Sequence, residues 1–504
     1  MFKNIIANFI GRFWSILSNF LFIPLYIHYL GFESYSIISF TLVIAGLMAV
    51  LDAGLTATLA REFSRMDNKH NDKVVIFNTL ESSYFVIIGL CVVSIFALSG
   101  IIADNWLNLK TFHPERVSFF LKIISFDVGF QLLFRFYMGG LLGLEKQVKA
   151  NMYQVGWGIL RNGLVVAALL FVPTLEMFFI WQTISTIIFT ILLRLSLNET
   201  LIGVYKFDFK FKIERSVLKK IWRFAGGVLL ISLVASLNTQ MDKIVISKLL
   251  PVESLGYYTL AVSLSMGIIV LVNPISVALL PRFTALYSSG KKEEASLLFN
   301  KINLVVAILV FSIMANMAFF SKELIWIWTG NMEIANQVHF YLPIIATSLA
   351  MISLTILPYD IAIANGYTKL NNVMGLISLF VTLPGYWFAT KYFGAIGAAY
   401  VFCGVQTVST LIYLYLINKK FIKTKRISNL YLQQMLFPLC ISLFIAFCFS
   451  FIPSWVNNNR VISLVWIGIS TVFTFGISGI LLIEWTEVKK TINFLINFKK
   501  VPIK

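Results

Sequence analysis

Long apolar runs follow one another along almost the whole chain, and short polar segments separate them. A helix that crosses a bilayer needs about 20 predominantly apolar residues. Fourteen runs meet this requirement: 5–30, 37–59, 84–102, 119–142, 152–172, 177–197, 225–247, 257–280, 304–320, 341–364, 373–389, 395–416, 435–452 and 461–483. The segment 173–176 is very short, which favours an antiparallel hairpin there over one long helix. The pattern predicts an all-α integral membrane protein with about 14 transmembrane helices.

The amino-acid composition excludes a water-soluble fold. Of the 504 residues, 58% are hydrophobic and 13% are charged, whereas soluble domains contain about 25% charged residues. A chain this apolar has more hydrophobic surface than a water-facing fold can bury. Most of its surface must therefore face lipid. Soluble dehydrogenases, kinases and nucleic-acid-binding proteins are therefore excluded.

Polar segments that are rich in lysine and arginine alternate along the chain with segments that contain few of them. If the N-terminus is placed inside the cell, 29 of the 41 basic residues fall in inner segments and 6 in outer segments. Cytoplasmic loops of membrane proteins carry an excess of Lys and Arg. We therefore expect both termini in the cytoplasm. We attribute most of the net charge of +18 to topology rather than to a nucleic-acid partner.

The longest polar segment inside the chain, 198–224, follows the sixth run and carries seven basic residues. It divides a first six-helix lobe (1–197) from a second (225–417), and 418–504 adds a helix pair and a basic tail. Phe32-Glu33-Ser34 follows the first run of one half, and Val252-Glu253-Ser254 follows the first run of the other. This match indicates a tandem repeat whose two lobes surround a central cavity.

The sequence contains no recognisable catalytic or metal site. Its four cysteines and four histidines are scattered without the spacing of a metal motif. The outer segments are short and hold no paired carboxylates, which argues against a polysaccharide polymerase or ligase. We therefore expect a transporter rather than an enzyme, with no cofactor and no metal.

Ten ionisable residues fall inside or at the ends of the predicted membrane helices, where charge is costly and often functional. They are Arg12, Asp52, Lys122, Asp127, Arg135, Arg161, Arg194, Asp242, Lys243 and Asp360. Six are basic and four acidic, so the predicted interior is slightly cationic. A cationic interior suits an anionic passenger such as a phosphorylated lipid.

The fourth predicted helix has the clearest polar pattern. Asp127, Gln131 and Arg135 are spaced at i, i+4 and i+8, so they share one face that lines a cavity or pairs with another helix. A purely structural ion pair is an equal alternative. Gly139, Gly140 and Gly143 follow and allow close helix contact.

The first predicted helix of each half carries a polar stripe. One stripe is Asn8, Arg12, Ser15 and Asn19, and the other is Ser232, Ser236, Thr239 and Lys243. Both stripes are expected to line the cavity. The alternative for Arg12 and Lys243 is that they reach the headgroup region.

Arg161 lies near the middle of its helix, where a side chain cannot easily reach the interface, so it is the strongest candidate for substrate binding. Arg194 and Lys122 lie near helix ends, and we interpret them as reaching the headgroups. The carboxylates Asp52, Asp127, Asp242 and Asp360 are candidates for ion coupling, or partners of nearby basic residues.

Several phrases resemble the Wzx-type polysaccharide flippases, within the superfamily of multidrug, oligosaccharidyl-lipid and polysaccharide exporters. The phrases are Asn8-Phe9-Ile10-Gly11-Arg12, Leu30-Gly31-Phe32-Glu33, Leu51-Asp52-Ala53-Gly54, Met241-Asp242-Lys243, Leu255-Gly256-Tyr257, and Pro281-Arg282-Phe283. The resemblance covers nearly the whole chain in length, topology and phrase order. The last two helices resemble the extra pair of the lipid II flippases.

The resemblance implies a passenger, an oligosaccharide repeat unit of O-antigen type on undecaprenyl pyrophosphate. It implies alternating access across the bacterial inner membrane, coupling to H⁺ or Na⁺, and delivery to a polysaccharide polymerase and a chain-length regulator. It also implies that cavity cations contact the pyrophosphate, which we assign to Arg12, Arg135, Arg161 and Lys243. A drug or cation antiporter of the same fold is the first alternative. A membrane polymerase or ligase and an ordinary solute permease are the others.

Overall fold

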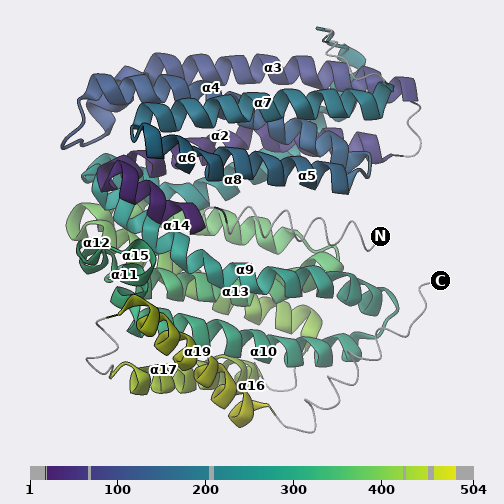
Figure 1. Cartoon of the computed structure of the whole chain (residues 1–504). Coiled ribbons are helices and arrows are strands. Elements are labelled where there is room, and N and C mark those ends of the chain that lie inside the picture. The colour runs from purple at the N-terminus through teal and green to yellow at the C-terminus, as the bar shows by residue number, and fades with distance from the viewer. Residues whose placement is uncertain are drawn as a thin grey trace. The chain divides into compact units, whose positions relative to one another are not determined.

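The computed structural model describes residues 18, 20–65, 70–203, 209, 211–423, 427–451 and 459–483. These residues form helices, turns and one isolated bridge, and no strand (Figure 1). Thirteen helices are long and apolar enough to cross a membrane, and they coincide with the second to fourteenth predicted runs. The described part of the first run forms the apolar helix Phe20–Leu30. The prediction of an all-α multi-pass membrane protein is confirmed.

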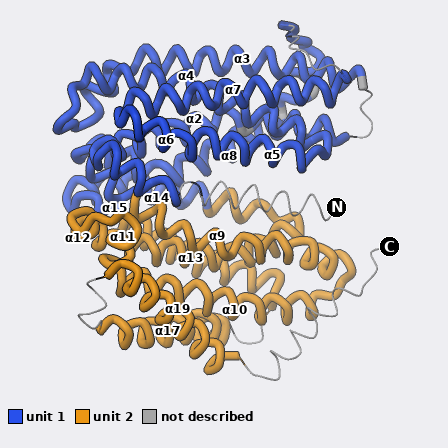
Figure 2. The backbone as a smooth tube through the Cα atoms, viewed as in Figure 1, with its two compact units in different colours: residues 1–259, 375–398 blue, residues 260–374, 399–504 orange. Residues whose placement is uncertain are grey.

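The chain separates into two compact units (Figure 2). Unit 1 comprises Met1–Thr259 and Gly375–Ala398, and unit 2 comprises Leu260–Met374 and Ala399–Lys504. The division into lobes 1–197 and 225–417, predicted from the sequence, stays a prediction.

Unit 1 is organised around α4, which packs against three of its neighbours, α2, α3 and α7. The elements that lie wholly in unit 1 are α2 (Phe32–Ser64), α3 (His70–Ile101), η1 (Ile102–Trp106), α4 (Pro114–Gly143), α5 (Gln147–Gly158), η2 (Ile159–Gly163), α6 (Leu164–Phe171), α7 (Leu175–Ile202) and α8 (Arg215–Leu249). Three helices have residues in both units: α9 (Val252–Ser288), α14 (Lys369–Phe393) and α15 (Ala395–Ile417).

Glycines bring α4 close to α2. A Cβ on Gly143 would lie 2.6 Å from the backbone oxygen of Ala60, and one on Gly139 would lie 2.5 Å from Thr56 Cγ2. Any side chain at these positions would push the helices apart, so the expected role of these glycines in close contact is confirmed.

The predicted hairpin at 173–176 is also confirmed. Helix α6 ends at Phe171 and α7 begins at Leu175, with Thr174 as its N-cap. The Thr174 hydroxyl accepts a hydrogen bond from Met177 N at 3.3 Å, which satisfies one of the unpaired amides of the first turn.

The repeated phrase marks the start of one helix in each half of the sequence. Helix α2 begins at Phe32 and α9 at Val252, each with a glutamate in the first turn. The backbone amide of Lys110 donates to Glu33 at 3.1 Å, and its ammonium lies 2.5 Å from Glu253. The hydrogen bond that Lys110 donates to Glu253 raises the pKa of this lysine. One residue therefore contacts the glutamates of both Glu-Ser segments, Glu33 and Glu253.

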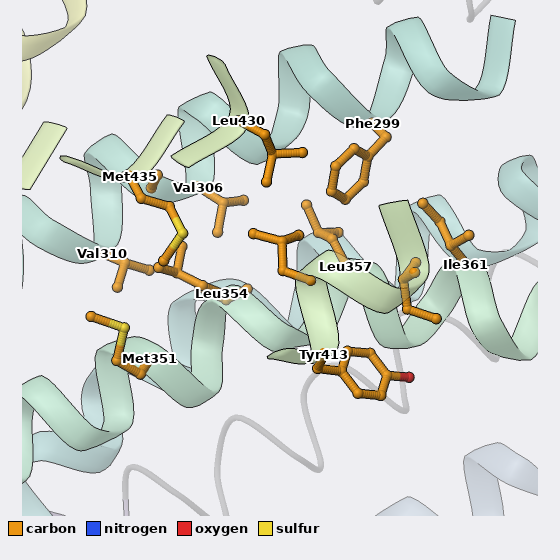
Figure 3. Close-up of a cluster of buried hydrophobic side chains, with 14 of the residues drawn as sticks. Phe299, Val306, Val310, Met351, Leu354, Leu357, Ile361, Tyr413, Leu430 and Met435 are labelled. Carbon is orange, nitrogen blue, oxygen red and sulfur yellow. The ribbon is translucent and has the colours of Figure 1, made fainter. Parts of the chain in front are cut away.

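Unit 2 is built on α10, which packs against α13, α17 and α19. Its remaining elements are α10 (Lys292–Phe319), α11 (Ser321–Thr329), α12 (Met332–Val338), α13 (Leu342–Ala364), α15 (Ala395–Ile417, with its first turn in unit 1), η3 (Asn418–Ile422), α16 (Ile427–Tyr431), η4 (Leu432–Leu436), α17 (Phe437–Phe449) and α19 (Arg460–Leu482). Figure 3 shows part of the core, where Val306 and Val310 of α10 lie near Leu354 and Leu357 of α13.

Small polar residues form the buried face of α19. Ser463, Ser470, Thr474 and Ser478 are buried, whereas its large apolar residues are mostly exposed, as expected where the surrounding solvent is lipid. Ser470 donates to the side-chain oxygen of Asn316 on α10 at 2.6 Å. The appended helices are thus held to unit 2 by hydrogen bonds between neutral side chains.

Candidate functional site

The charged side chains predicted at membrane depth gather in unit 1 around α4. Three buried carboxylates lie on three different helices, Asp52 on α2, Glu81 on α3 and Asp127 on α4, and each has its own hydrogen-bond donors. We name them by their acids: the Asp127 cluster, the Asp52 cluster and the Glu81 cluster. A fourth, the Asp242 cluster, lies where α8 meets the start of α9.

The Asp127 cluster is a bidentate ion pair. Arg161 Nη1 lies 2.7 Å from Asp127 Oδ1, and Nη2 lies 2.9 Å from Oδ2. Gln131 donates to Asp127 Oδ2 at 2.8 Å, and Thr186 Oγ1 lies 2.6 Å from Arg161 Nη1. The two charges are satisfied by each other and by neutral neighbours, as a buried ion pair requires.

A π-helical turn presents Arg161. The sequence predicted one continuous helix over 152–172, but η2 interrupts it between α5 and α6. Three successive carbonyls accept side-chain hydrogen bonds: Leu160 from Trp181 at 2.8 Å, Arg161 from Gln182 at 3.2 Å and Asn162 from Tyr26 at 2.7 Å. Such turns leave backbone groups unpaired and occur often at functional sites. Here the three donors hold the backbone of the turn, and the acceptors Asp127 and Thr186 hold the guanidinium of Arg161.

The Asp52 cluster combines α2 and α3. Thr56 and Tyr84 both donate hydroxyl hydrogen bonds to Asp52 Oδ1, the latter at 2.5 Å. Arg135 of α4 lies close enough for its charge to act on this carboxylate. Its own side chain is exposed and makes no ion pair within 4 Å to any acid that the structure describes. Arg135 is therefore an exposed basic side chain without an acidic partner within 4 Å among the described residues.

The Glu81 cluster is fully buried. Arg194 Nε lies 2.7 Å from Glu81 Oε1, and the two side chains are 1% and 0% exposed. Tyr137 of α4 donates to the same carboxylate at 2.7 Å. The interpretation of Arg194 as a residue that reaches the headgroups is therefore wrong, because α7 continues to Ile202 and keeps this arginine inside the bundle.

The Asp242 cluster occupies the polar stripe predicted on the seventh helix. Lys243 Nζ lies 3.4 Å from Asp242 Oδ1 and donates to the Thr239 carbonyl at 2.7 Å. Tyr258 donates to Asp242 Oδ2 at 2.8 Å. Lys243 thus has partners within its own helix, and its charge is balanced by its neighbour.

Unit 2 holds a different kind of carboxylate. Asp360 of α13 is 3% exposed, with Ser276 of α9 as a side-chain neighbour. Its Oδ2 has no hydrogen-bond partner among the described residues. No basic side chain among those residues lies within 4 Å of it, so its charge would be uncompensated there.

Comparison with known proteins assigns the chain to a family. The sequence profile described as "Polysaccharide biosynthesis protein" matches residues 1–287, more than half of the chain. The chain belongs to this polysaccharide biosynthesis protein family. A second profile, MatE, matches residues 228–388.

One known relative and two solved structures are consistent with membership of the polysaccharide biosynthesis protein family. The "Putative O-antigen transporter" of Shigella flexneri is 18% identical over 377 residues, 73% of this chain and 86% of that protein. The structure of lipid II flippase MurJ in an inward closed conformation has a TM-score of 0.74 at 16% identity, covering 95% of this chain and 99% of the other. An inward-facing multidrug resistance MATE transporter gives 0.66 at 15% identity, covering 82% and 96%. The resemblance to the exporter superfamily is confirmed, and the protein is a multi-pass membrane transporter of that superfamily.

The predicted site residues do not form a single site in the described structure. Arg12 and Asn19 lie outside the described residues. Gln131 and Arg161 join Asp127 in one cluster, as the shared face predicted for Asp127 and Gln131. Among the described residues, Arg135 forms no ion pair within 4 Å with this cluster, and its charge acts on Asp52. Their roles in substrate binding and ion coupling stay predictions.

Sequence reasoning missed Glu81. The predicted run began at residue 84, but α3 begins at His70 and buries this acid. A helical signal was present, because Phe77, Leu80 and Tyr84 share its buried face at spacings of three and four residues.

Proposed function

We propose that the protein flips an oligosaccharide repeat unit of O-antigen type, carried on undecaprenyl pyrophosphate, across the bacterial inner membrane by alternating access. Family membership and the name of the Shigella relative support a role in polysaccharide export. The likeness to the lipid II flippase structure supports a fold suited to a lipid-linked passenger. A pyrophosphate-sugar headgroup cannot cross about 30 Å of hydrocarbon unaided.

In this proposal, Arg135 contacts the pyrophosphate. It lies eight residues before the end of α4 at Gly143, about 12 Å along the helix. An exposed arginine at this depth is costly in lipid, so it needs a water-filled path or an anionic ligand. A guanidinium binds phosphate oxygens in pairs. The exposed and unpaired Arg135 is the observation that carries the proposal.

Asp360 is the best candidate for ion coupling. Asp127 and Asp242 are balanced by Arg161 and Lys243, and Arg135 lies near Asp52. Asp360 has an oxygen without a hydrogen-bond partner in the part of the chain that the structure describes. A buried carboxylate of this kind is stable when it binds H⁺ or a cation such as Na⁺.

The distribution of Lys and Arg supports both termini in the cytoplasm, so the repeat unit would be loaded from that side. A polysaccharide polymerase and a chain-length regulator would then act on the flipped unit. The protein itself would act as a transporter and not as an enzyme.

The test uses a bacterial strain that lacks its own repeat-unit flippase and carries the genes of the surrounding polysaccharide cluster. We expect this chain to restore surface polysaccharide, and Arg135→Ala to abolish it at unchanged protein level. Arg116→Ala is the matched control, because Arg116 lies on the same helix but pairs with Glu176 at 2.6 Å. If the repeat unit reaches the outer leaflet without this chain and polymerisation alone fails, the transport proposal is wrong.

A drug or cation antiporter is the second candidate, favoured by the MatE match over residues 228–388. It predicts resistance to cationic drugs in an efflux-deficient strain. In such a strain the flippase proposal predicts no change in drug tolerance, with surface polysaccharide as the only phenotype.

A further inference from the structure

Five exposed lysines gather at one end of unit 2, and we call this group the lysine corner. It consists of Lys292, Lys369, Lys419, Lys420 and Lys423. They come from the start of α10, the start of α14 and the π-helical turn η3, which are far apart in the sequence.

Side-chain contacts hold these elements together. Ser296 of α10 donates to the carbonyl of Ile422 in η3. The ring of Phe421 contacts Tyr287 of α9 at 6.4 Å and Tyr367, just before α14, at 5.7 Å between centroids. The lysine corner is therefore one surface built on a packed aromatic base.

The lysine corner lacks acidic partners. Among the described residues, none of its five lysines forms an ion pair within 4 Å; Glu294 pairs with Lys291, and Glu293 is the acid beside Lys292 in the sequence. Several basic residues of unit 1 do have acidic partners: Arg61 and Arg65 flank Glu62, and Lys149 pairs with Glu199. Like charges on elements that pack together repel one another, and a bound anion would reduce this repulsion.

Two lysines are held in fixed positions. Lys420 Nζ lies 3.3 Å from the centroid of the Tyr367 ring, a close cation–π contact. Lys423 has a φ of 54°, a left-handed conformation unusual for a residue with a side chain, and its amide donates to the Asn418 carbonyl at 2.7 Å. The turn thus presents its lysines in a defined arrangement rather than as a flexible tail.

The lysine corner also lies at the right depth for lipid. Two membrane spans begin at its residues, Lys292–Phe319 and Lys369–Phe393, and a third, Ala395–Ile422, ends between Lys420 and Lys423. Lysines at helix ends extend their ammonium groups to the level of the headgroups. A phosphate at this level would come from the surrounding bilayer.

We propose that the lysine corner binds the headgroup of an anionic phospholipid, with Lys420 and Lys423 as its central contacts. This interaction is separate from the proposed passenger and would hold even if the protein carried another substrate. Each lysine near an anionic lipid surface strengthens binding by about five-fold, so two lysines account for about 25-fold.

The test is native mass spectrometry of the purified full chain, titrated in detergent with phosphatidylglycerol or with phosphatidylcholine of the same acyl chains. We expect tighter retention of phosphatidylglycerol by more than ten-fold, and loss of this preference in the double variant Lys420→Ala/Lys423→Ala. Lys322→Ala is the matched control, because Lys322 is an exposed lysine of α11 in the same unit. Thermal unfolding of each variant shows that it is folded.

Two results would overturn the proposal. In the first, the wild-type chain retains both lipids equally, or the double variant keeps the preference. In the second, inorganic phosphate or pyrophosphate at millimolar concentration competes fully with phosphatidylglycerol. Full competition would make the lysine corner a site for free anions rather than for a lipid headgroup.

Discussion

The two units stabilise their membrane interiors by different means. Unit 1 buries acids and bases together, as in Glu81–Arg194 and Asp127–Arg161. Unit 2 uses neutral amides and hydroxyls, such as Asn316 with Ser470, and Asp360 is its only buried charged residue among those described. An ion pair makes each partner dependent on the other, whereas a hydroxyl contact can be lost at small cost. The same type of substitution should therefore have larger effects in unit 1.

The largest effect is expected at the Glu81 cluster. Arg194→Met leaves Glu81 buried without its cation, which should lower the free energy of unfolding by about 3–5 kcal/mol. The double variant Glu81→Leu/Arg194→Met removes both charges and should recover much of this loss. Thermal unfolding in detergent measures both. A double variant no more stable than the single one would show that the pair contributes through packing alone.

A smaller effect is expected where α4 crosses α2. Gly143→Ala places a methyl group 2.6 Å from the Ala60 carbonyl oxygen and should cost about 1–3 kcal/mol through helix displacement. Gly267→Ala in α9 is the control, because a Cβ there has no atom within 4 Å. It should be neutral or slightly stabilising in the same unfolding measurement. Equal losses at both positions would contradict the close approach of α2 and α4.

The smallest effect on stability is expected in unit 2. Asn316→Ala removes hydrogen bonds to Ser470 and Thr474 but leaves no charge unpaired. It should cost about 0.6–1.7 kcal/mol, as measured for neutral hydrogen bonds between membrane helices. A loss as large as that of Arg194→Met would remove the distinction between the units.

Asp360 tests the difference between the two units in another way, because it is a buried acid of unit 2 without a basic partner among the described residues. Asp360→Asn should leave unfolding unchanged or slightly improved, since it removes a buried charge without a basic partner. In the proposed function it should also abolish flipping driven by the ion gradient. Surface polysaccharide in the complemented strain provides the readout. Full flipping by Asp360→Asn would exclude it from ion coupling.

The membrane helices could be predicted from the sequence because about 20 apolar residues are needed to cross a bilayer, and few other folds leave that pattern. The hairpin before α7 followed from a local signal, a very short polar segment. The start of α9 at Val252 did not, because the predicted run began at residue 257. The partner of Arg194 could not be predicted, since Glu81 lies 113 residues away in the sequence.

The π-helical turn at Arg161 could not be predicted from the sequence either. Its free carbonyls are stabilised by donors from Trp181, Gln182 and Tyr26, which the sequence alone does not bring together. The sequence therefore identified which charged residues lie at membrane depth. It could not identify their ion-pair partners, because these depend on tertiary packing. For that reason the sequence favoured Arg161 for substrate binding. Of the three described cations assigned to the passenger, Arg161 and Lys243 make ion pairs, and Arg135 makes none with a described acid.

The most direct measurement compares these two arginines in the flippase-deficient strain, with surface polysaccharide as the readout and membrane protein level as the control. We expect Arg135→Ala to abolish surface polysaccharide at normal protein level. The neutral double variant Asp127→Leu/Arg161→Leu, which removes a balanced pair, should keep much of it. If Arg135→Ala flips normally and the double variant is folded but inactive, the passenger contacts the Asp127 cluster, and the account given for Arg135 is wrong.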